Sequence, residues 1–216
     1  MKFILKVGKT GVEPINLGEP TLFHQKGNFL NITLSSQDQR PTAEIGVVYE
    51  WGGIGYLFPK AAVNEDVHCE GDSLTAETAE RYIRERKPTL LFIHFSLVDE
   101  AGHTKGWGSP AYYTAVHQAD SLIGGILQAI KDGGMTDETV VLVTADHGGL
   151  KTIHGGKSLQ EMEIPWMVCG PGINKGKELD ESVMTFDTAA TLARLLGLKA
   201  PQVWIGRTVT SAFVRH

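Results

Sequence analysis

Residues 89–103 read TLLFIHFSLVDEAGH and residues 139–149 read TVVLVTADHGG, and these two stretches give the strongest indication of the fold. Each begins with a nearly continuous apolar run of strand length, 89–97 in the first stretch and 139–145 in the second, which is typical of a strand covered on both faces of a sheet. Each run then passes directly into acidic and imidazole side chains. Because open α/β sheets bind ligands at the carboxyl ends of their strands, these polar residues stand where a functional site is expected.

Other segments supply the remaining elements of the same kind of fold. Ser73 is a candidate N-cap for a helix, Ser109 followed by Pro110 opens a long helix, and Gly133 ends it. Strands that alternate with helices predict an α/β fold, a three-layer sandwich with a largely parallel central sheet. Besides the two runs above, we predict strands over 44–49 and 164–168, and helices over 73–87, 109–132 and 185–196.

The chain has 216 residues, of which 42% are hydrophobic and 21% are charged, a composition that suits one sizeable folded core. Residues 1–40 show no period, and the Gly- and Pro-rich stretch 7–20 within them predicts loop. We therefore predict an irregular lead-in over residues 1–40 and a single domain over residues 41–216.

Charge and apolar patterning exclude several classes of function. The 20 basic and 25 acidic residues give a net charge of −5, which argues against nucleic acid as the main partner but not against a small phosphorylated substrate. No apolar run approaches the roughly 20 residues needed to span a bilayer. The apolar run at the start of the chain is too short for a signal peptide, and the localisation stays open. Cys69 and Cys169 form no CxxC pair, so neither a disulfide framework nor a cysteine metal site is indicated.

Five side chains with metal-binding capacity follow the two apolar runs: Asp99, His103, Asp146, His147 and His154. Taken singly, each has an ordinary structural explanation as a helix cap, a hydrogen-bonded pair or a loop histidine. If the two strands are parallel neighbours, all five converge on one edge, and carboxylate with imidazole is a common ligand set for zinc. We expect the nearby glycines to let the backbone pass close to the ions. The combination favours a metal site.

Several motifs together carry a family resemblance. They are FIHFSLVDEAGH (92–103), VTADHGG (143–149), HGGK (154–157), EIPW (163–166) and GPG (170–172), with a further set near the C-terminus, in 187–207. With these motifs the sequence resembles the alkaline phosphatase superfamily, and within it the type I phosphodiesterase/nucleotide pyrophosphatase-like branch. The resemblance covers roughly residues 40 to 210 and implies that 41–216 is an alkaline phosphatase-like metal-binding domain.

The resemblance implies a two-metal hydrolase of phosphoric esters. In that family the positions of Asp99, His103 and His154 hold one ion, and those of Asp146 and His147 hold most of a second. Two divalent ions are expected, zinc first and manganese as the alternative. Such a pair stabilises the attacking and leaving oxygens of a displacement at phosphorus in a small phosphorylated substrate.

The sequence departs from the family pattern at its start. The family supplies another metal-binding Asp and a Thr or Ser nucleophile upstream of the position of Asp99, but this chain has no Asp before Asp38. The second metal site is therefore incomplete, and the catalytic residues stay unassigned. We expect that the family's N-terminal section is missing here, which would leave a sheet edge open to self-association. The resemblance also implies that full-length relatives are often exported.

Two functions follow from the sequence. The first is divalent-metal-dependent hydrolysis of phosphomonoesters, phosphodiesters or nucleotide pyrophosphates; the alternative is a truncated, non-catalytic metal-binding remnant. A sulfatase is a minor third reading, since neither cysteine lies in the Cys/Ser-x-Pro-x-Arg setting that sulfatases modify. Lys157 is a candidate contact for a phosphoryl oxygen, although a solvated loop lysine is the simpler reading, and His94 is expected in the core.

Overall fold

The computed structural model describes residues 2–5 and 31–214, so the predicted loop over 7–20 lies outside the described residues. The strands are β1 (Lys2–Leu5), β2 (Ile45–Tyr49), β3 (Glu65–His68), β4 (Leu90–His94), β5 (Val141–Thr144) and β6 (Trp166–Cys169). The α-helices are α1 (Asn31–Gln39), α2 (Asp72–Arg86), α3 (Leu97–Lys105), α4 (Pro110–Asp132), α5 (Leu159–Met162) and α6 (Asp187–Leu195). Short 3₁₀ turns lie at Gly52–Tyr56, Lys60–Ala62, Thr136–Glu138 and Thr210–Ala212.

The six strands form one sheet in the order β3-β2-β4-β1-β5-β6. Strand β2 pairs in parallel with β3 and β4, whereas β1 pairs antiparallel with both β4 and β5, and β6 pairs antiparallel with β5. Four strands therefore share one direction, which confirms the predicted α/β fold with a largely parallel sheet. Strand β1 was not predicted, whereas the strand predicted over 164–168 is observed as β6, and only its reversed direction was unexpected.

Strand β1 corrects one expectation about the site. The sequence suggests that the strands β4 and β5 are parallel neighbours, but β1 lies between them and pairs with both. His94 at the end of β4 and Thr144 at the end of β5 both stand opposite Lys2 in the register. The two strands consequently end at the same level of the same sheet edge, and the residues that follow them can still meet.

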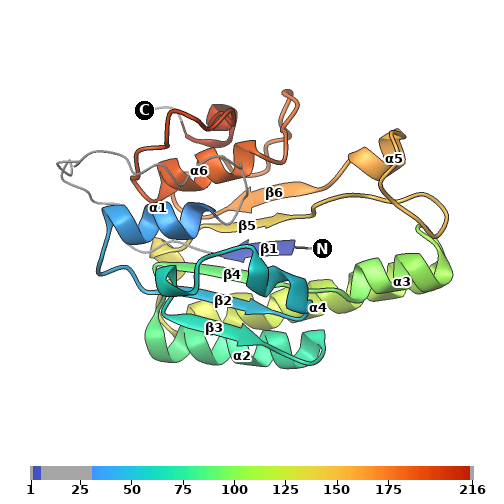
Figure 1. Cartoon of the computed structure of the whole chain (residues 1–216), viewed down its shortest axis with the longest axis horizontal. Helices are drawn as coiled ribbons and strands as arrows, with labels where there is room; N and C mark the ends of the chain where they lie inside the picture. The colour runs from blue at the N-terminus through green and yellow to red at the C-terminus, as the bar shows by residue number, and fades with distance from the viewer. Residues whose placement is uncertain (1, 6–30, 215–216) are drawn as a thin grey trace.

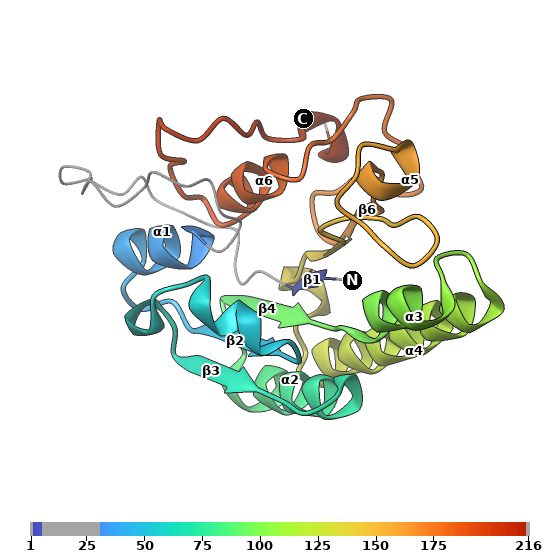
Figure 2. The same cartoon turned by 45° about the vertical axis from the view of Figure 1, so that its right-hand side comes forward.

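Helices cover both faces of the sheet, as Figure 1 and Figure 2 show, with α1 and α6 on one side and α2 and α4 on the other. Successive residues of each central strand alternate between the two cores, which is the period-two pattern of a strand. Phe92 and Leu142 pack in the core shared with α6, whereas Ile93 and Val143 pack in the core shared with α2 and α4. This double burial is the physical reason for the unbroken apolar runs in the sequence.

Helix α3 is the element that the sequence did not predict and that positions half of the site. The strand expected to run to Leu97 ends at His94, and Leu97 instead begins the helix. Its N-terminus is capped from outside: the Asp72 carboxylate accepts hydrogen bonds from the backbone N–H groups of Ser96 and Leu97, each at 2.9 Å. A carboxylate at this end satisfies backbone donors and is favoured by the helix dipole.

The predicted ends of the other helices are mostly confirmed. Ser109 caps α4 by accepting a hydrogen bond from the Tyr112 N–H at 3.1 Å, and Pro110 occupies the first helical position. Gly197 follows the end of α6 with φ +63°, a left-handed conformation that favours glycine. The N-cap of α2 is Gly71, so the prediction for Ser73 was wrong by two residues.

Residues 1–40 contribute a strand and a helix, β1 and α1, although no regular element was predicted there. The division at residue 40 and the unity of residues 41–216 stay predictions. Of the described strands, β3 and β6 form the two edges of the sheet, and self-association through an edge also stays a prediction. Within the described residues, no helix is both long enough and apolar enough to cross a bilayer.

Candidate metal centre

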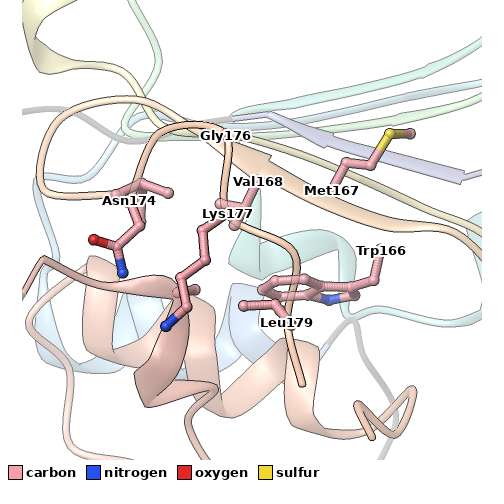
Figure 3. A pocket seen from close by; sticks show the side chains of 9 residues that line it. Trp166, Met167, Val168, Asn174, Gly176, Lys177 and Leu179 are labelled. Atoms are coloured by element: carbon pink, nitrogen blue, oxygen red, sulfur yellow. The ribbon is translucent and has the colours of Figure 1, made fainter. Parts of the chain in front are cut away.

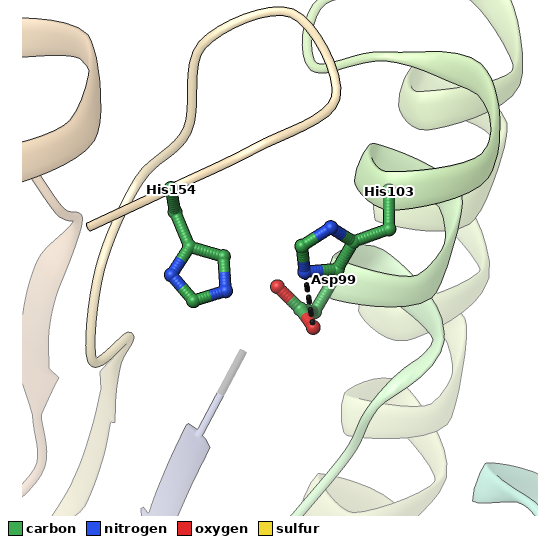
Figure 4. Close-up of side chains that lie close together, drawn as sticks. All are labelled: Asp99, His103 and His154. Atoms are coloured by element: carbon green, nitrogen blue, oxygen red, sulfur yellow. Dashed lines mark ion pairs between the residues drawn. The ribbon is translucent and has the colours of Figure 1, made fainter. Parts of the chain in front are cut away.

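The five predicted side chains come from two segments at the carboxyl edge of the sheet. Asp99 and His103 lie one turn apart on helix α3, and neighbours at this spacing lie on the same side of a helix. Asp146 and His147 directly follow β5, and His154 lies in the loop beyond them. Figure 4 shows His154 opposite Asp99 and His103, with the loop on one side and α3 on the other.

Asp99, His103 and His154 form the tightest part of the cluster. One potential ligand atom from each of the three lies within 4.8 Å of the others. The Nε2 atom of His103 is 3.6 Å from Oδ2 of Asp99, and the rings of His103 and His154 have centroids 4.9 Å apart. Nitrogen and oxygen donors at such separations can converge on a single ion, whose bonds to such donors are about 2 Å long.

His147 joins the second pair to the first three residues. Its Nε2 atom lies 3.5 Å from Oδ2 of Asp146 and 3.8 Å from Oδ1 of Asp99. Its ring stacks on that of His154, with centroids 3.7 Å apart and an angle of 16° between the planes. The structure thus brings all five predicted residues into one contiguous cluster, with Asp99 facing both parts.

Two of the histidines are held in the orientation that metal-binding histidines commonly show. The Nδ1 atoms of His103 and His147 lie 2.9 Å from the Thr152 carbonyl oxygen and 2.8 Å from the Gly148 carbonyl oxygen. A carbonyl oxygen only accepts hydrogen bonds, so Nδ1 carries the proton and donates it. In the neutral ring, the lone pair is then on Nε2, which faces the carboxylates.

The carboxylate of Asp99 has an unused acceptor. Its Oδ1 atom is buried and accepts no hydrogen bond from any described residue. A buried polar atom without a partner is uncommon in native structures, and an ion is one of the partners that satisfies it. The side chains remain accessible as a group, since Asp99 is 38% exposed and His103 is 42% exposed. A cation and a small ligand can therefore reach the cluster from solvent.

The loop that carries His154 is tied to helix α5. The N–H groups of Gly148 and Gly149 donate to the carbonyl oxygens of Glu161 and Gln160, each at 2.8 Å. The Glu161 carboxylate accepts hydrogen bonds from the Ser158 hydroxyl and from the N–H of Gly156. These hydrogen bonds, that of the Ser158 hydroxyl first, lower the pKa of Glu161. The loop is therefore fixed at both ends by hydrogen bonds.

The glycines of the site have a packing role that the sequence did not indicate, and the expected approach of the backbone to ions stays a prediction. A Cβ atom at Gly149 would lie 2.2 Å from the indole of Trp107, and one at Gly102 would lie 2.5 Å from the same indole. A Cβ at Gly148 would lie 2.1 Å from the Gln160 carbonyl oxygen. These glycines make room for protein atoms, mainly those of Trp107.

Three residues that matter to the geometry were missed by the sequence reasoning: Asp72, Trp107 and Glu161. Each acts through a partner distant in sequence or through a loop conformation, and neither can be recognised from the periodicity of the sequence. The Ser158-x-x-Glu161 spacing was the one available signal, because it is the pattern of a capping box, and the structure contains that box. The predicted core position of His94 is observed, and Lys157 is exposed.

A separate pocket of about 240 Å³ lies beside β6 and contains none of the predicted site residues (Figure 3). The amide of Asn174 donates to the carbonyl oxygens of Ser211 and Phe213, and the Trp166 indole N–H donates to the Thr188 hydroxyl. The polar groups of these two lining residues are thus already hydrogen-bonded within the protein. The pocket gives no indication of a ligand class.

The sheet, its helical layers and the polar cluster at the carboxyl edge define an alkaline phosphatase-like α/β protein. Two solved structures share the fold. One, Ps i-CgsB, has a TM-score of 0.61 and 14% identity, over 87% of this chain and 56% of its own. The other is an alkaline phosphatase superfamily protein from Vibrio parahaemolyticus, with a TM-score of 0.59 and 17% identity over 84% of this chain and 51% of its own.

The chain belongs to the type I phosphodiesterase / nucleotide pyrophosphatase family, whose profile matches residues 35–162, more than half of its length. Curated relatives include arylsulfatase K of Xenopus laevis, 32% identical over 42% of this chain and 18% of that protein. Steryl-sulfatase of Rattus norvegicus is 29% identical over 60% of this chain and 27% of its own length. Phosphopentomutase of Herpetosiphon aurantiacus is 26% identical over 71% and 38%. This chain therefore spans well under half the length of these relatives.

Proposed function

We propose that the chain is a divalent-metal-dependent hydrolase of phosphoric esters, acting on phosphomonoesters, phosphodiesters or nucleotide pyrophosphates. The family is named for phosphodiester and nucleotide pyrophosphate hydrolysis, and two relatives are named sulfatases, so the broader class is hydrolysis of phosphoric or sulfuric esters. One observation carries the proposal: Asp99, His103 and His154 offer ligand atoms within 4.8 Å of one another, and His147 links Asp146 to them.

The residues present fit a divalent cation. Asp99, His103 and His154 would hold one ion, and Asp146 with His147 would supply part of a second site. The Nε2 atoms of His103 and His147 face the carboxylates. The buried Oδ1 atom of Asp99 accepts no hydrogen bond from the described residues. Imidazole with carboxylate suits zinc, with manganese as the alternative. When bound, such an ion supplies positive charge that stabilises a phosphoryl oxygen in the transition state.

Other residues of this chain would orient the metal-binding histidines and attract the substrate. The Thr152 and Gly148 carbonyl groups hold the protons of His103 and His147 on Nδ1, so that the opposite ring nitrogen stays an electron-pair donor. Exposed Lys157, three residues beyond His154, would attract the phosphoryl group of a small substrate by its charge. The nucleophile is unassigned.

The phosphoric ester is favoured over the sulfuric ester because the family model that matches residues 35–162 is that of the type I phosphodiesterases and nucleotide pyrophosphatases. Cys69 precedes Glu70 and Cys169 precedes Gly170, and neither cysteine is followed by the Pro and Arg that accompany the modified residue of sulfatases. As for the identity of the bound ion, the three imidazoles of the cluster favour zinc over calcium, because calcium prefers oxygen ligands.

The test is turnover by purified protein of known metal content. We expect the zinc-loaded chain to hydrolyse p-nitrophenyl phosphate or its bis-ester, to leave p-nitrophenyl sulfate untouched, and to lose activity with a chelator. Replacement of His154 by Ala is expected to reduce the bound metal, measured by elemental analysis. Metal-replete protein that hydrolyses none of the three esters contradicts the proposed activity.

A second function, a non-catalytic metal-binding chain, is favoured by one observation. Within the described residues, one set of three donor residues converges, and the pair Asp146 and His147 falls short of a complete second site. This alternative predicts about one tightly held ion per chain and no hydrolysis. Two bound ions together with turnover would overturn it.

A further inference from the structure

We infer that Trp107 is a positioning residue that fixes the distance between the two halves of the candidate metal centre. The inference rests on the proposed metal site but concerns a residue with no ligand atom for the ion. One half of the centre is on helix α3, which carries Asp99 and His103. The other half is the loop with His147 and His154, and Trp107 lies in the turn that follows α3.

The indole of Trp107 contacts a histidine from each half. Its ring centroid lies 5.0 Å from that of His103 with an angle of 82° between the planes, and 6.0 Å from that of His154 with an angle of 73°. Both are edge-to-face arrangements, which aromatic rings prefer at these separations. The same side chain therefore limits the movement of two predicted ligands from different segments.

The backbone on both sides is built around this indole. Gly102 on α3 and Gly149 in the loop each lack the Cβ that would lie 2.5 Å and 2.2 Å, respectively, from the indole. The Trp107 N–H donates to the Lys151 carbonyl oxygen at 2.7 Å, which joins the turn to the loop. Gly106 and Gly108, with φ +93° and +77°, allow the turn to present the indole between the two halves.

This arrangement sets the separation of the ligands before an ion binds. Without the indole, a space would be left between Gly102 and Gly149. The side chains of His103 and His154 would then have more conformational freedom, and an ion would have to restrict it on binding. Residues that orient metal ligands typically contribute about 10- to 100-fold in metal affinity. We therefore expect Trp107→Ala to weaken zinc binding about tenfold or more, while Trp107→Phe, which retains a ring, recovers most of the affinity.

The experiment measures the dissociation constant for Zn²⁺ by competition with a chromophoric chelator, together with the visible absorption spectrum of the Co²⁺-loaded protein. The spectrum reports ligand geometry, which a loss of stability alone does not change. Trp51→Ala is the matched control, because Trp51 is 56% exposed and packs against His94 rather than against a predicted ligand. We expect the Co²⁺ spectrum to change in Trp107→Ala and to remain unchanged in Trp51→Ala.

Gly149→Ala provides an independent measurement, since its added methyl group would collide with the indole. We expect it to weaken Zn²⁺ binding in the wild-type background but to have little effect when combined with Trp107→Phe or Trp107→Ala, where the collision is relieved in part or in full. Such non-additivity is the signature of a direct contact. If Trp107→Ala does not fold, Gly149→Ala alone and with Trp107→Phe carries the test.

The outcomes separate this inference from the proposed function. Wild-type protein that binds no Zn²⁺ overturns both. Wild-type protein that binds Zn²⁺ while the Trp107 and Gly149 variants show unchanged affinity and unchanged Co²⁺ spectra overturns the positioning role alone. An equal loss of affinity in Trp51→Ala also overturns it, because the effect would then reflect general destabilisation.

Discussion

The carboxylate of Asp72, the first residue of α2, caps helix α3 by accepting a hydrogen bond from the N–H of Leu97 at 2.9 Å. A second oxygen of the same carboxylate accepts from Ser96 at the same distance. Asp72 is 8% exposed, so these bonds are largely shielded from water. Because Leu97 lies two residues before Asp99, the cap determines where the helix begins and thus where Asp99 points.

Replacement of Asp72 by Ala should destabilise the protein. It leaves two N–H groups at the start of α3 without an acceptor, and loss of a helix cap costs about 0.5–2 kcal/mol. We expect the free energy of unfolding in urea to fall by that amount and Zn²⁺ binding to weaken.

The control for this substitution is Ser73→Ala. Ser73 is the neighbouring hydroxyl residue that the sequence suggested as a cap, but it is exposed and the N-cap of α2 is Gly71. Its replacement should change neither the free energy of unfolding nor the affinity for Zn²⁺. Equal effects of the two substitutions would show that the hydrogen bonds from Ser96 and Leu97 to Asp72 contribute neither to stability nor to Zn²⁺ binding.

The pKa of Asp72 predicts a pH dependence of defined sign. Burial raises this pKa, and the hydrogen bonds from Leu97 and Ser96 only partly oppose the shift. A raised folded-state pKa means that the contribution of this group to stability is fully present below its ordinary pKa and is lost as the pH rises through the folded value. We expect the free energy of unfolding of the wild type minus that of Asp72→Asn to decrease as the pH rises above about 3.8.

Urea titrations of both proteins at several pH values measure this difference. Ser73→Ala, which removes no ionisable group from an exposed position next to Asp72, is the matched control, and its difference from the wild type should not change with pH in the same window. A difference that increases with pH would contradict the assignment, because it would mean that the folded state favours the charged carboxylate.

The central strands could be predicted from sequence because burial on both faces demands apolar side chains at every position. Phe92 and Ile93 are adjacent in sequence and lie in different cores, so the apolar run itself reported the double burial. Strand direction carries no such mark. The residues of β6 would suit a parallel strand as well as an antiparallel one. Its antiparallel pairing with β5 therefore could not be predicted from its own sequence.

The members of the site were also predictable, but their geometry was not. Residues that follow strands of the same direction in one sheet share an edge, which brought Asp99 and His147 together even though β1 separates their strands. Helix α3 was missed because its first apolar residue, Leu97, continued the strand pattern and because Gly102 is a poor helix former. The contacts of Trp107 depend on the meeting of two distant segments, which no local pattern encodes.

Replacement of Glu161 by Gln should loosen the loop that carries His154. The carboxylate accepts hydrogen bonds from the Ser158 hydroxyl and the Gly156 N–H, and a Gln side chain cannot accept through both of its terminal atoms. We expect hydrogen-exchange protection of the Gly156 amide to fall roughly tenfold, as charge-assisted hydrogen bonds are the stronger ones. Glu163→Gln, at an exposed position two residues away, should leave this protection unchanged.

The lowered pKa of Glu161 adds a pH test of the same contact. A depressed folded-state pKa means that the stabilising contribution is present above the ordinary value of 4.5 and is lost as the pH falls through the folded value. Protection at Gly156, corrected for the intrinsic exchange rate, should therefore decline in acid in the wild type and less so in Glu161→Gln. Parallel declines in the two proteins would show that the carboxylate does not hold the loop.

Zinc should stabilise the folded chain by mass action, whether or not the chain is catalytic. An ion that binds only the folded state adds about 2.7 kcal/mol to the free energy of unfolding when its free concentration is 100 times the dissociation constant. Urea unfolding in zinc-buffered solution and in chelator measures the gain, which His154→Ala should abolish at the same free zinc concentration. His117→Ala, on an exposed position of α4, should retain it. Equal stabilisation of both variants would place the bound zinc elsewhere on the chain. Because the measurement requires binding and not turnover, it tests the metal centre separately from the unassigned nucleophile.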